Sequence, residues 1–477
     1  MKTVLFATSE ARPLIKTGGL ADVSGALPAA LRELGIDCRL LLPGYHSVLA
    51  ALDNAQEVAR FTGLPGLVDS RLLLGAMPDS GVPVYVIDAP AYYLRAGGPY
   101  HDASGVDHPD NAERFGLLSR VAAILCTAES PLDWRPDLLH CNDWQTGLAP
   151  AWLHFAGRPV ASVMTIHNLA FQGIFPPAMV ASLGLPPESF QIAGVEYFGS
   201  LSFLKAGLFY ADRITTVSPS YAEEIRQEPL GMGLQGLLTT RADQLTGIIN
   251  GIDTADWNPA SDPHLPATYS ARALAGKRRC KDALQADLNL EIAPLAPLFG
   301  VVSRLTSQKG LDWIIQVAPG IIDRGGQLAI LGTGDKAIET ALRALVAAYP
   351  GRISATIGYD EGLSHRIEAG ADIFLMPSRF EPCGLNQMYS LHYGTVPIVH
   401  ATGGLKDTVE DAVTGFVFHD ANAHGLWLAI ERALALHADK GAWKRLMQAG
   451  MSRDFSWERS AREYLNLYED TLAKRRA

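Results

Sequence analysis

The sequence predicts an α/β protein with two similar domains, each built on a parallel β-sheet. Its 477 residues exceed what one hydrophobic core usually organises. Short apolar runs that end in Gly, Asn, Asp or Ser alternate with helix-period segments from end to end. This alternation of strand and helix patterns is interrupted once, in a polar, proline-containing stretch that follows residues 248–253.

Two series of strands follow from this pattern. The first contains residues 4–8, 38–43, 84–88, 138–141, 163–167 and 213–217, and the second contains residues 298–303, 328–331, 353–358, 373–376, 396–399 and 415–418. We place the first domain at residues 1–248 and the second at residues 249–456. Residues 457–477 space apolar and aromatic side chains at helical intervals, which predicts an amphipathic terminal helix.

Composition excludes several classes of protein. Apolar residues make up 48% and charged residues 19% of the chain, a balance typical of globular proteins. The net charge of −10 and the lack of Lys or Arg runs argue against a nucleic-acid or anionic-membrane surface. Five cysteines without C-x-x-C spacing argue against a disulfide framework or a zinc site. With no signal peptide and no apolar stretch of about 18 residues, we expect a soluble, cytoplasmic protein.

A glycine motif occurs once in each half. Residues 17–23 read Thr-Gly-Gly-Leu-Ala-Asp-Val, and residues 402–409 read Thr-Gly-Gly-Leu-Lys-Asp-Thr-Val. Paired glycines before a helix let the backbone approach a ligand, and the helix N-terminal amides can face a phosphate or a sugar. A tight strand-to-helix turn is the alternative. The duplication, and Lys16 beside the first motif, favour binding.

Two cations follow the first strand of the second domain. Residues 301–310 read Val-Val-Ser-Arg-Leu-Thr-Ser-Gln-Lys-Gly, so Arg304 and Lys309 lie at its carboxyl end, where α/β proteins bind ligands. A guanidinium and an ammonium can neutralise a diphosphate leaving group without a metal. The chain has no Asp-x-Asp pair to hold a divalent cation. Exposed charges on a loop are the alternative.

Further polar side chains end other strands. Residues 379–386 read Arg-Phe-Glu-Pro-Cys-Gly-Leu-Asn, in which Glu381 can accept bonds from sugar hydroxyls and Cys383 marks a backbone turn rather than a nucleophile. Residues 165–168 read Thr-Ile-His-Asn and residues 140–144 read His-Cys-Asn-Asp-Trp, and the acidic and aromatic side chains of the latter suit a pyranose. Tyr359 is either a platform for adenine or ribose, or an ordinary half-buried tyrosine.

Together, these motifs resemble those of bacterial glycogen synthases and plant starch synthases, and the resemblance spans essentially the whole chain. It implies a GT-B fold, in which two Rossmann-like domains face each other across a deep cleft and the terminal helix returns to the first domain. It also implies transfer of glucose from ADP-glucose to the non-reducing end of an α-1,4-glucan, with release of ADP and retention of the α-configuration.

The resemblance also assigns roles residue by residue. It implies that Lys16, Arg304 and Lys309 contact the donor phosphates or the leaving group, that Glu381 orients the donor glucose, and that His167 lies beside it. We therefore predict a catalytic set of Glu381, His167, Arg304 and Lys309. The predicted substrate-binding set is Lys16, Gly18, Gly19, Asp22, Asp143, Asn168, Asn250, Tyr359, Cys383, Gly384, Leu385, Thr402, Gly403 and Gly404.

Two positions depart from related patterns. Tyr389 replaces the second carboxylate of the wider retaining GT-B pattern, so no carboxylate is expected to bind the ribose there. His400-Ala401 stands where many relatives carry a basic residue, so one positive charge near the donor is expected to be missing. We predict no cofactor, neither a metal nor pyridoxal phosphate.

Three alternatives remain open. The first is a related GT-B transferase that uses UDP-glucose and a small acceptor, and the second is a glucan-binding protein without turnover. The motifs at residues 16–20 and 381–384 count against the first. The intact set of Lys16, His167, Arg304, Lys309 and Glu381 counts against the second. The third, a glucan phosphorylase, needs a lysine that holds pyridoxal phosphate, and no such motif is recognised.

Overall fold

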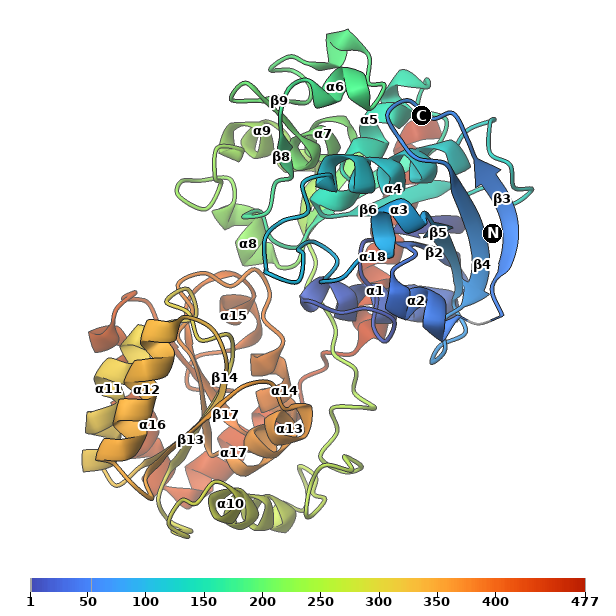
Figure 1. Ribbon diagram of the computed structural model, residues 1–477. Helices are drawn as coiled ribbons and strands as arrows, with labels where there is room; N and C mark the ends of the chain where they lie inside the picture. Colours follow the sequence, from blue (N-terminus) through green and yellow to red (C-terminus); the bar gives the residue numbers. More distant parts are fainter. Residues whose placement is uncertain (1, 53, 477) are drawn as a thin grey trace. The chain divides into compact units, whose positions relative to one another are not determined.

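The computed structural model describes residues 2–52 and 54–476, which form two α/β units (Figure 1). The first unit comprises Met1–Gly251 and Trp457–Ala477, and the second comprises Ile252–Ser456. The sequence placed the boundary after residue 248, so residues 249–251 belong to the first unit rather than the second. Residues 1, 53 and 477, which the predicted domains include, lie outside the described part of the chain.

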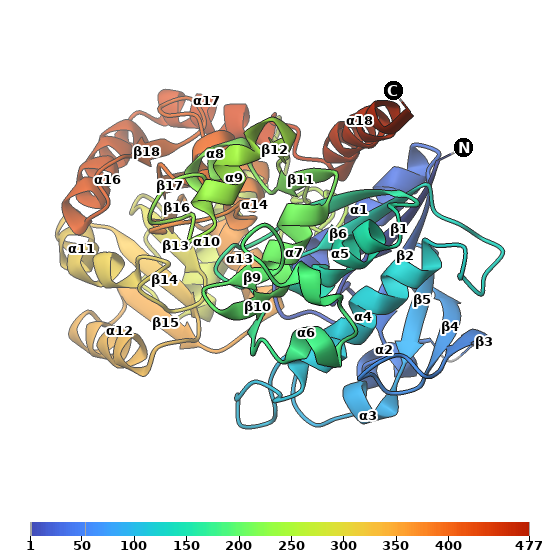
Figure 2. The same ribbon diagram turned by 90° about the horizontal axis from the view of Figure 1, so that it is seen from above.

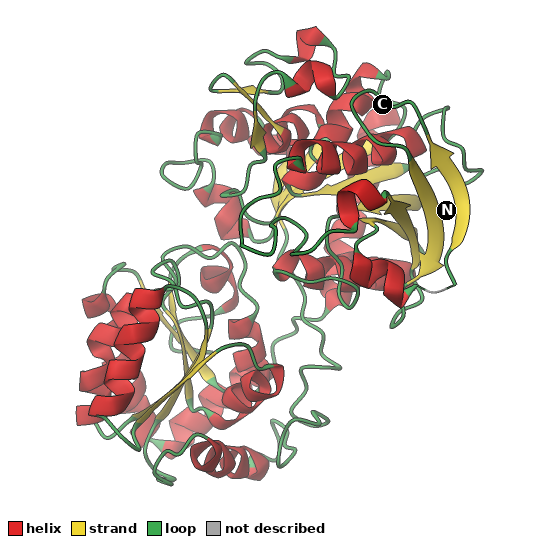
Figure 3. Ribbon diagram, in the orientation of Figure 1, coloured by secondary structure: helices red, strands yellow, loops and turns green. Residues whose placement is uncertain are grey.

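The first unit is built on a sheet of nine strands within the described residues, in the order β12-β11-β7-β6-β1-β2-β5-β4-β3. The strands are β1 (Thr3–Ala7), β2 (Asp37–Pro43), β3 (Gln56–Phe61), β4 (Ser70–Ala76), β5 (Pro83–Asp88), β6 (Leu138–Asn142), β7 (Ala161–Ile166), β11 (Arg213–Thr216) and β12 (Leu245–Gly247). Strand β4 is antiparallel to both of its neighbours, β3 at one edge of the sheet (Figure 3) and β5, whereas the other neighbouring strands pair in parallel. A small separate sheet contains β8 (Ile174–Phe175), β9 (Glu196–Tyr197) and β10 (Ser200–Ser202).

Helices cover both faces of the first unit's sheet. They are α1 (Gly19–Glu33), α2 (His46–Ala51), α3 (Pro90–Tyr93), α4 (Asn111–Leu125), α5 (Leu148–Phe155), α6 (Met179–Ser182), α7 (Phe203–Tyr210), α8 (Pro219–Glu224), α9 (Gln235–Thr240) and α18 (Trp457–Arg476). Helices α1 and α18 pack together on one face, and α4, α5 and α7 form a layer on the other (Figures 1 and 2). This double cover explains why the central parallel strands are almost wholly buried.

The terminal helix is held to the first unit by a buried polar network. The hydroxyl of Tyr468 lies 2.6 Å from His140 Nδ1, and the hydroxyl of Thr165 lies 2.6 Å from His140 Nε2. Burial lowers the pKa of His140 to about 3, so the ring is neutral and one nitrogen donates while the other accepts. The network joins α18 to β6 and β7, which confirms that the terminal helix returns to the first domain.

The second unit contains a sheet of six strands within the described residues, in the order β15-β14-β13-β16-β17-β18, all parallel. Its strands are β13 (Leu298–Val302), β14 (Gln327–Gly332), β15 (Ile353–Ile357), β16 (Ile373–Met376), β17 (Val396–His400) and β18 (Phe416–Phe418). Its helices are α10 (Ala275–Asp287), α11 (Leu311–Asp323), α12 (Lys336–Ala348), α13 (Glu361–Gly370), α14 (Asn386–His392), α15 (Gly403–Thr408), α16 (Ala423–Ala438) and α17 (Lys440–Met451). Helices α11, α12 and α16 cover one face of the sheet, and α10 and α13 cover the other (Figure 1).

Each of the twelve predicted strands coincides with an observed strand to within two residues at either end. Strands β3 and β4 were not predicted because they lie at an exposed edge, where charged residues interrupt the apolar run. Strand β12, a half-buried strand of three residues at the opposite edge, was not predicted either. Among the described helices, none combines the length and the apolar character needed to cross a membrane.

Candidate active site

The predicted site residues lie at the carboxyl ends of parallel strands, in loops that lead into helices. In the first unit, Lys16 follows β1, Asp143 follows β6 and His167 follows β7. In the second unit, Arg304 follows β13 and Glu381 follows β16. Carboxyl ends of parallel strands share one edge of a sheet, so each unit gathers its candidate residues at one edge.

A buried carboxylate supports the glycine loop of the first unit. Glu10 is 3% exposed, and its side chain accepts bonds from the backbone N–H of Thr17, from the Thr17 hydroxyl at 2.6 Å and from the Tyr100 hydroxyl. Neither Glu10 nor Tyr100 was predicted from the sequence as a site residue. The polar run of residues 8–10, directly after an apolar strand, was the signal for Glu10, whereas nothing in the sequence connects Tyr100 to this loop.

The two glycines of this loop are exposed, and the unit's own packing does not require them. A Cβ atom built on Gly18 or Gly19 would meet no described atom within 4 Å, and Gly18 has an extended φ of −157°. Helix α1, which has 15 residues, has Gly18 at its N-terminal cap. Glycine has no side chain that could accept a hydrogen bond from the first N–H groups of the helix. The first N–H groups of this helix therefore have room for an anion at close range.

Lys16 and Asp22 are brought together at the same helix start. Lys16 Nζ lies 2.7 Å from Asp22 Oδ1, and the Lys16 side chain is 45% exposed. Asp22 was predicted to bind substrate, but its contact here is with Lys16. The carboxylate therefore holds the ammonium group beside the exposed glycines.

Asp143 and His167 form a second buried group. Asp143 has a positive φ of 54°, and its Oδ1 accepts the backbone N–H of His167 at 2.7 Å. Burial raises the pKa of Asp143 to about 7, against the lowering effect of the backbone N–H groups of His167 and Asn168. Asn168 itself accepts the N–H of Ala170 through Oδ1 at 3.0 Å, so it stabilises its own turn.

The protonation of His167 is set by Asn142, which the sequence analysis did not select. Burial lowers the pKa of His167 to about 3, so its ring is neutral. Asn142 donates from Nδ2 to the Ala7 carbonyl at 3.0 Å, which leaves its Oδ1 to accept from His167 Nε2 at 2.9 Å. The proton is therefore on Nε2, and Nδ1 is an acceptor for a ligand hydroxyl.

Two further residues of this edge differ in what they offer a ligand. Asn250 is 6% exposed, and its Oδ1 is buried without a hydrogen-bond partner among the described residues. Trp144, whose ring the sequence suggested for a pyranose, packs instead between Phe115, Phe175 and Phe203 at centroid distances of 4.9 to 6.1 Å. Trp144 belongs to the core, so that interpretation was wrong.

The central contact of the second unit is an ion pair. Lys309 Nζ lies 2.5 Å from Glu381 Oε2, which also accepts the Ser378 hydroxyl at 3.0 Å. The side chains of Lys309 and Glu381 are 18% and 8% exposed, so the pair is largely shielded from water. Arg304 is exposed on the same loop, and its guanidinium reaches Gln308 Oε1 at 3.3 Å. The two cations therefore have different surroundings.

The second glycine motif packs on the turn that carries Glu381. Gly403 has a φ of +42°, and a Cβ there would lie 2.0 Å from the Glu381 carbonyl oxygen. A Cβ on Gly404 would lie 2.2 Å from the Cys383 carbonyl oxygen. The motif begins at Thr402, which is 3% exposed and lies at the N-terminal cap of α15. These glycines are required by close packing, as in a tight turn, and substrate binding by this motif stays a prediction.

The remaining predicted residues line the same edge of the second unit. Cys383 is 5% exposed, Gly384 has a φ of +73° and Leu385 is the N-terminal cap residue of α14, which agrees with a backbone turn rather than a nucleophile. Tyr359 is 81% exposed, so its ring is accessible for stacking rather than half buried. Tyr389 stacks on Trp257, with centroids 3.9 Å apart.

Comparisons with known proteins agree with these features. Residues 3–240 match the family model described as starch synthase catalytic domain, and residues 289–446 match the model described as glycosyl transferases group 1. A glycogen synthase of Nitrosomonas eutropha is 55% identical, over 99% of this chain and 97% of its own length. A glycogen synthase of Aromatoleum aromaticum is 57% identical, over 98% and 96% of the two chains.

Solved structures support the fold. The catalytic domain of starch synthase IV from Arabidopsis thaliana, bound to ADP and acarbose, is 32% identical with a TM-score of 0.86, and 99% of each chain is covered. Sucrose-phosphate synthase from Thermosynechococcus elongatus has 19% identity and a TM-score of 0.60, over 99% of this chain and all of the other, and supports the fold alone. The predicted GT-B fold is confirmed. With relatives at this identity over nearly its whole length, the chain belongs to the glycogen and starch synthase family of glycosyltransferases.

Proposed function

We propose that the chain transfers glucose from ADP-glucose to the non-reducing end of an α-1,4-glucan, with release of ADP and retention of the α-configuration. The observation that carries this proposal is the shielded Lys309–Glu381 pair at the carboxyl end of β16. Both bonds described for Glu381 use Oε2, so Oε1 is the oxygen left to accept a sugar hydroxyl. Lys309 then holds the carboxylate and supplies positive charge to the leaving diphosphate.

The donor phosphates are neutralised by side-chain cations in this proposal. Lys16, Arg304 and Lys309 lie in loops that follow β1 and β13, and the exposed N–H groups at the start of α1 add a further site for an anion. Positive side chains stabilise a developing phosphate charge at the moment of bond cleavage, as a metal would. We therefore propose that the transfer needs neither a metal nor pyridoxal phosphate.

The donor glucose is oriented by neutral and acidic groups. Glu381 accepts a hydroxyl through Oε1, and His167 accepts another through Nδ1 because Asn142 fixes its proton on Nε2. We propose front-face attack, in which the departing phosphate takes the proton of the acceptor hydroxyl. In this mechanism no carboxylate of the chain has to act as a nucleophile.

The relatives support the choice of substrates. The starch synthase IV structure contains ADP and acarbose, and the curated relatives are glycogen synthases. By this similarity we propose ADP-glucose and glycogen, or another α-1,4-glucan, as the partners of this chain. We also propose a cytoplasmic location, since its five cysteines are buried and form no disulfide within the described residues.

The test is release of nucleotide from purified protein. ADP-glucose or UDP-glucose is supplied with and without glycogen, in the presence and absence of a chelator. Glycogen-dependent ADP release that resists the chelator supports the proposal. Release from UDP-glucose alone would indicate a related transferase, release that the chelator abolishes would contradict metal-independent transfer, and no release would indicate a glucan-binding protein.

A further inference from the structure

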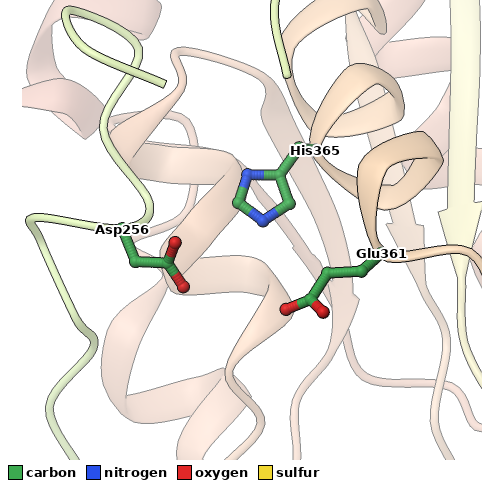
Figure 4. Close-up of side chains that lie close together, drawn as sticks. All are labelled: Asp256, Glu361 and His365. Carbon is green, nitrogen blue, oxygen red and sulfur yellow. The ribbon is translucent and has the colours of Figure 1, made fainter. Parts of the chain in front are cut away.

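A cluster of metal-ligating side chains lies outside the proposed active site, within the second unit. Asp256 lies on the segment that follows Gly251, while Glu361 and His365 lie on α13. Their ligand atoms all lie within 4.8 Å of one another. Figure 4 shows the three side chains pointing toward one another. Glu361 and His365 are four residues apart on a helix, so they share one face.

The buried histidine provides an independent sign of a ligand. His365 is 1% exposed, and its Nδ1 lies 2.8 Å from Asp262 Oδ2, which also accepts the Tyr393 hydroxyl at 2.5 Å. Since Asp262 accepts, Nδ1 carries a proton, and Nε2 is the nitrogen whose lone pair the neutral ring can give to a metal. Nε2 is buried and has no hydrogen-bond partner within the described residues. A buried acceptor without a donor is costly, and a bound cation would satisfy it.

We propose that Asp256, Glu361 and Nε2 of His365 bind one divalent transition-metal ion of the zinc or manganese type. A neutral imidazole and two carboxylates form a ligand set that such ions accept, and water completes the shell. Histidines that bind metals commonly donate their other N–H to a carboxylate, as His365 does to Asp262. Trp257 stacks on the imidazole, with centroids 3.7 Å apart and planes 14° apart, so the ring is held in place.

Small side-chain movements complete the shell. Ligand atoms about 2.0–2.2 Å from a tetrahedral ion lie roughly 3.3–3.6 Å apart, which is closer than the 4.8 Å limit within which these atoms lie. Glu361 is exposed and can rotate inward, whereas buried His365 supplies the fixed point. The ion would join the segment around Asp256 to the first turn of α13. It would have a structural role, separate from glucose transfer, because none of the residues assigned to the donor binds it.

The test uses the full-length protein, freed of metal with a chelator and then titrated with ZnCl₂ or MnCl₂. We expect one equivalent to bind and the melting temperature to rise with metal concentration. Glu361→Gln, which removes a ligand charge from an exposed side chain, should weaken binding at least tenfold. Asp360→Asn is the matched control, because it removes one charge from the adjacent residue while an Asn side chain still caps α13 at Leu363.

Three results would overturn the proposal. The first is wild-type protein that does not saturate with either ion at millimolar concentration. The second is Glu361→Gln protein that binds the metal as tightly as wild type. The third is a Co²⁺ complex whose absorption spectrum contains a thiolate charge-transfer band, since the proposed ligands contain no sulfur. Glu361→Gln, rather than a change at buried His365, tests the site without disturbing the core.

Discussion

The two glycine motifs have nearly the same sequence but different structural roles. In the first unit, Gly18 and Gly19 face space that no described atom fills, and the support comes from Glu10 beneath the loop. In the second unit, Gly403 and Gly404 pack directly on the carbonyl oxygens of the turn that carries Glu381. The first motif is open for a ligand, whereas the second is part of the scaffold that positions a side chain.

The same contrast extends to the polar groups around each motif. In the first unit, Asp143 is a buried carboxyl group with a raised pKa, and Asn250 has a buried oxygen without a partner among the described residues. In the second unit, Glu381 is paired with Lys309 and bonded to Ser378. The first unit therefore leaves buried polar groups that a substrate could bind. In the second unit, Glu381 already has its hydrogen-bond and ion-pair partners without a substrate. Four substitutions test this difference, in order of decreasing effect.

Lys309→Ala tests whether the assembled pair acts in catalysis. It removes the cation from the proposed leaving group and leaves Glu381 without its partner, so turnover should fall by about 10²–10³-fold, or roughly 3–4 kcal/mol. Steady-state kinetics with ADP-glucose and glycogen measure the loss, and circular dichroism checks the fold. The control is Lys336→Ala, which breaks an ion pair between an exposed lysine and buried Glu339 in the same unit and should keep wild-type turnover. Near-normal activity of Lys309→Ala would refute the role.

Gly403→Ala tests whether the second motif is scaffold. The new Cβ would lie 2.0 Å from a carbonyl oxygen at a residue with positive φ, so the free energy of unfolding should fall by about 3 kcal/mol. Thermal or urea unfolding of the full chain measures the change. A variant as stable as wild type would show that the start of α15 is not tightly packed. The second motif would then not differ from the first in this respect.

Gly18→Ala tests whether the first motif is open for a ligand. The methyl group meets no described atom within 4 Å, so stability should stay within about 0.5 kcal/mol of wild type. KM for ADP-glucose should rise by roughly tenfold, because the methyl group occupies space proposed for the donor. Gly236→Ala is the control, since a Cβ there also meets no described atom and the position has no proposed role. Equal KM values for the two variants would argue against donor binding at this loop.

Asp143→Asn tests the cost of burying a carboxyl group, since burial raises the pKa of Asp143. The pKa of Asp143 is raised from 3.8 to about 7, so between these values the unfolded chain releases a proton that the folded chain retains. Stability conferred by this group therefore falls as the pH rises from about 4 to 7. Asparagine removes this dependence, tolerates the positive φ and retains an acceptor for the His167 N–H.

The variant should be more stable than wild type by about 1 kcal/mol at pH 8 and less active, a trade between stability and function. Thermal unfolding at pH 5 and pH 8 measures the difference. The exposed Asp69→Asn should reproduce the wild-type pH profile. If Asp143→Asn loses stability equally at both pH values, the carboxyl group is not protonated in the way described.

Much of the fold could be predicted because parallel strands buried on both faces must be apolar. The twelve predicted strands were all found, whereas the edge strands β3 and β4 were missed because their exposure permits charged residues. The ends of strands could also be predicted, because polar residues that directly follow an apolar run lie at the carboxyl edge of the parallel sheet. This is why Arg304, Lys309, Glu381 and His167 could be selected from local sequence patterns.

The supporting residues could not be predicted in the same way. Tyr100 reaches Glu10 across 90 positions of sequence, and Asn142 meets His167 across 25. The difference in packing between the two glycine motifs, and the placement of Trp144 in the core, also depend on which atoms fill the surrounding space. No local pattern encodes these contacts.

The sequence by itself determined the two-domain α/β architecture, the succession of strands along the chain and the loops that carry chemistry. Periodicity and polarity are local properties that each segment must satisfy wherever it lies. Only the tertiary structure decided which glycine pair is open, which nitrogen of His167 is protonated and that the pKa of Asp143 is raised. These depend on close packing and burial, which arise when segments distant in sequence meet.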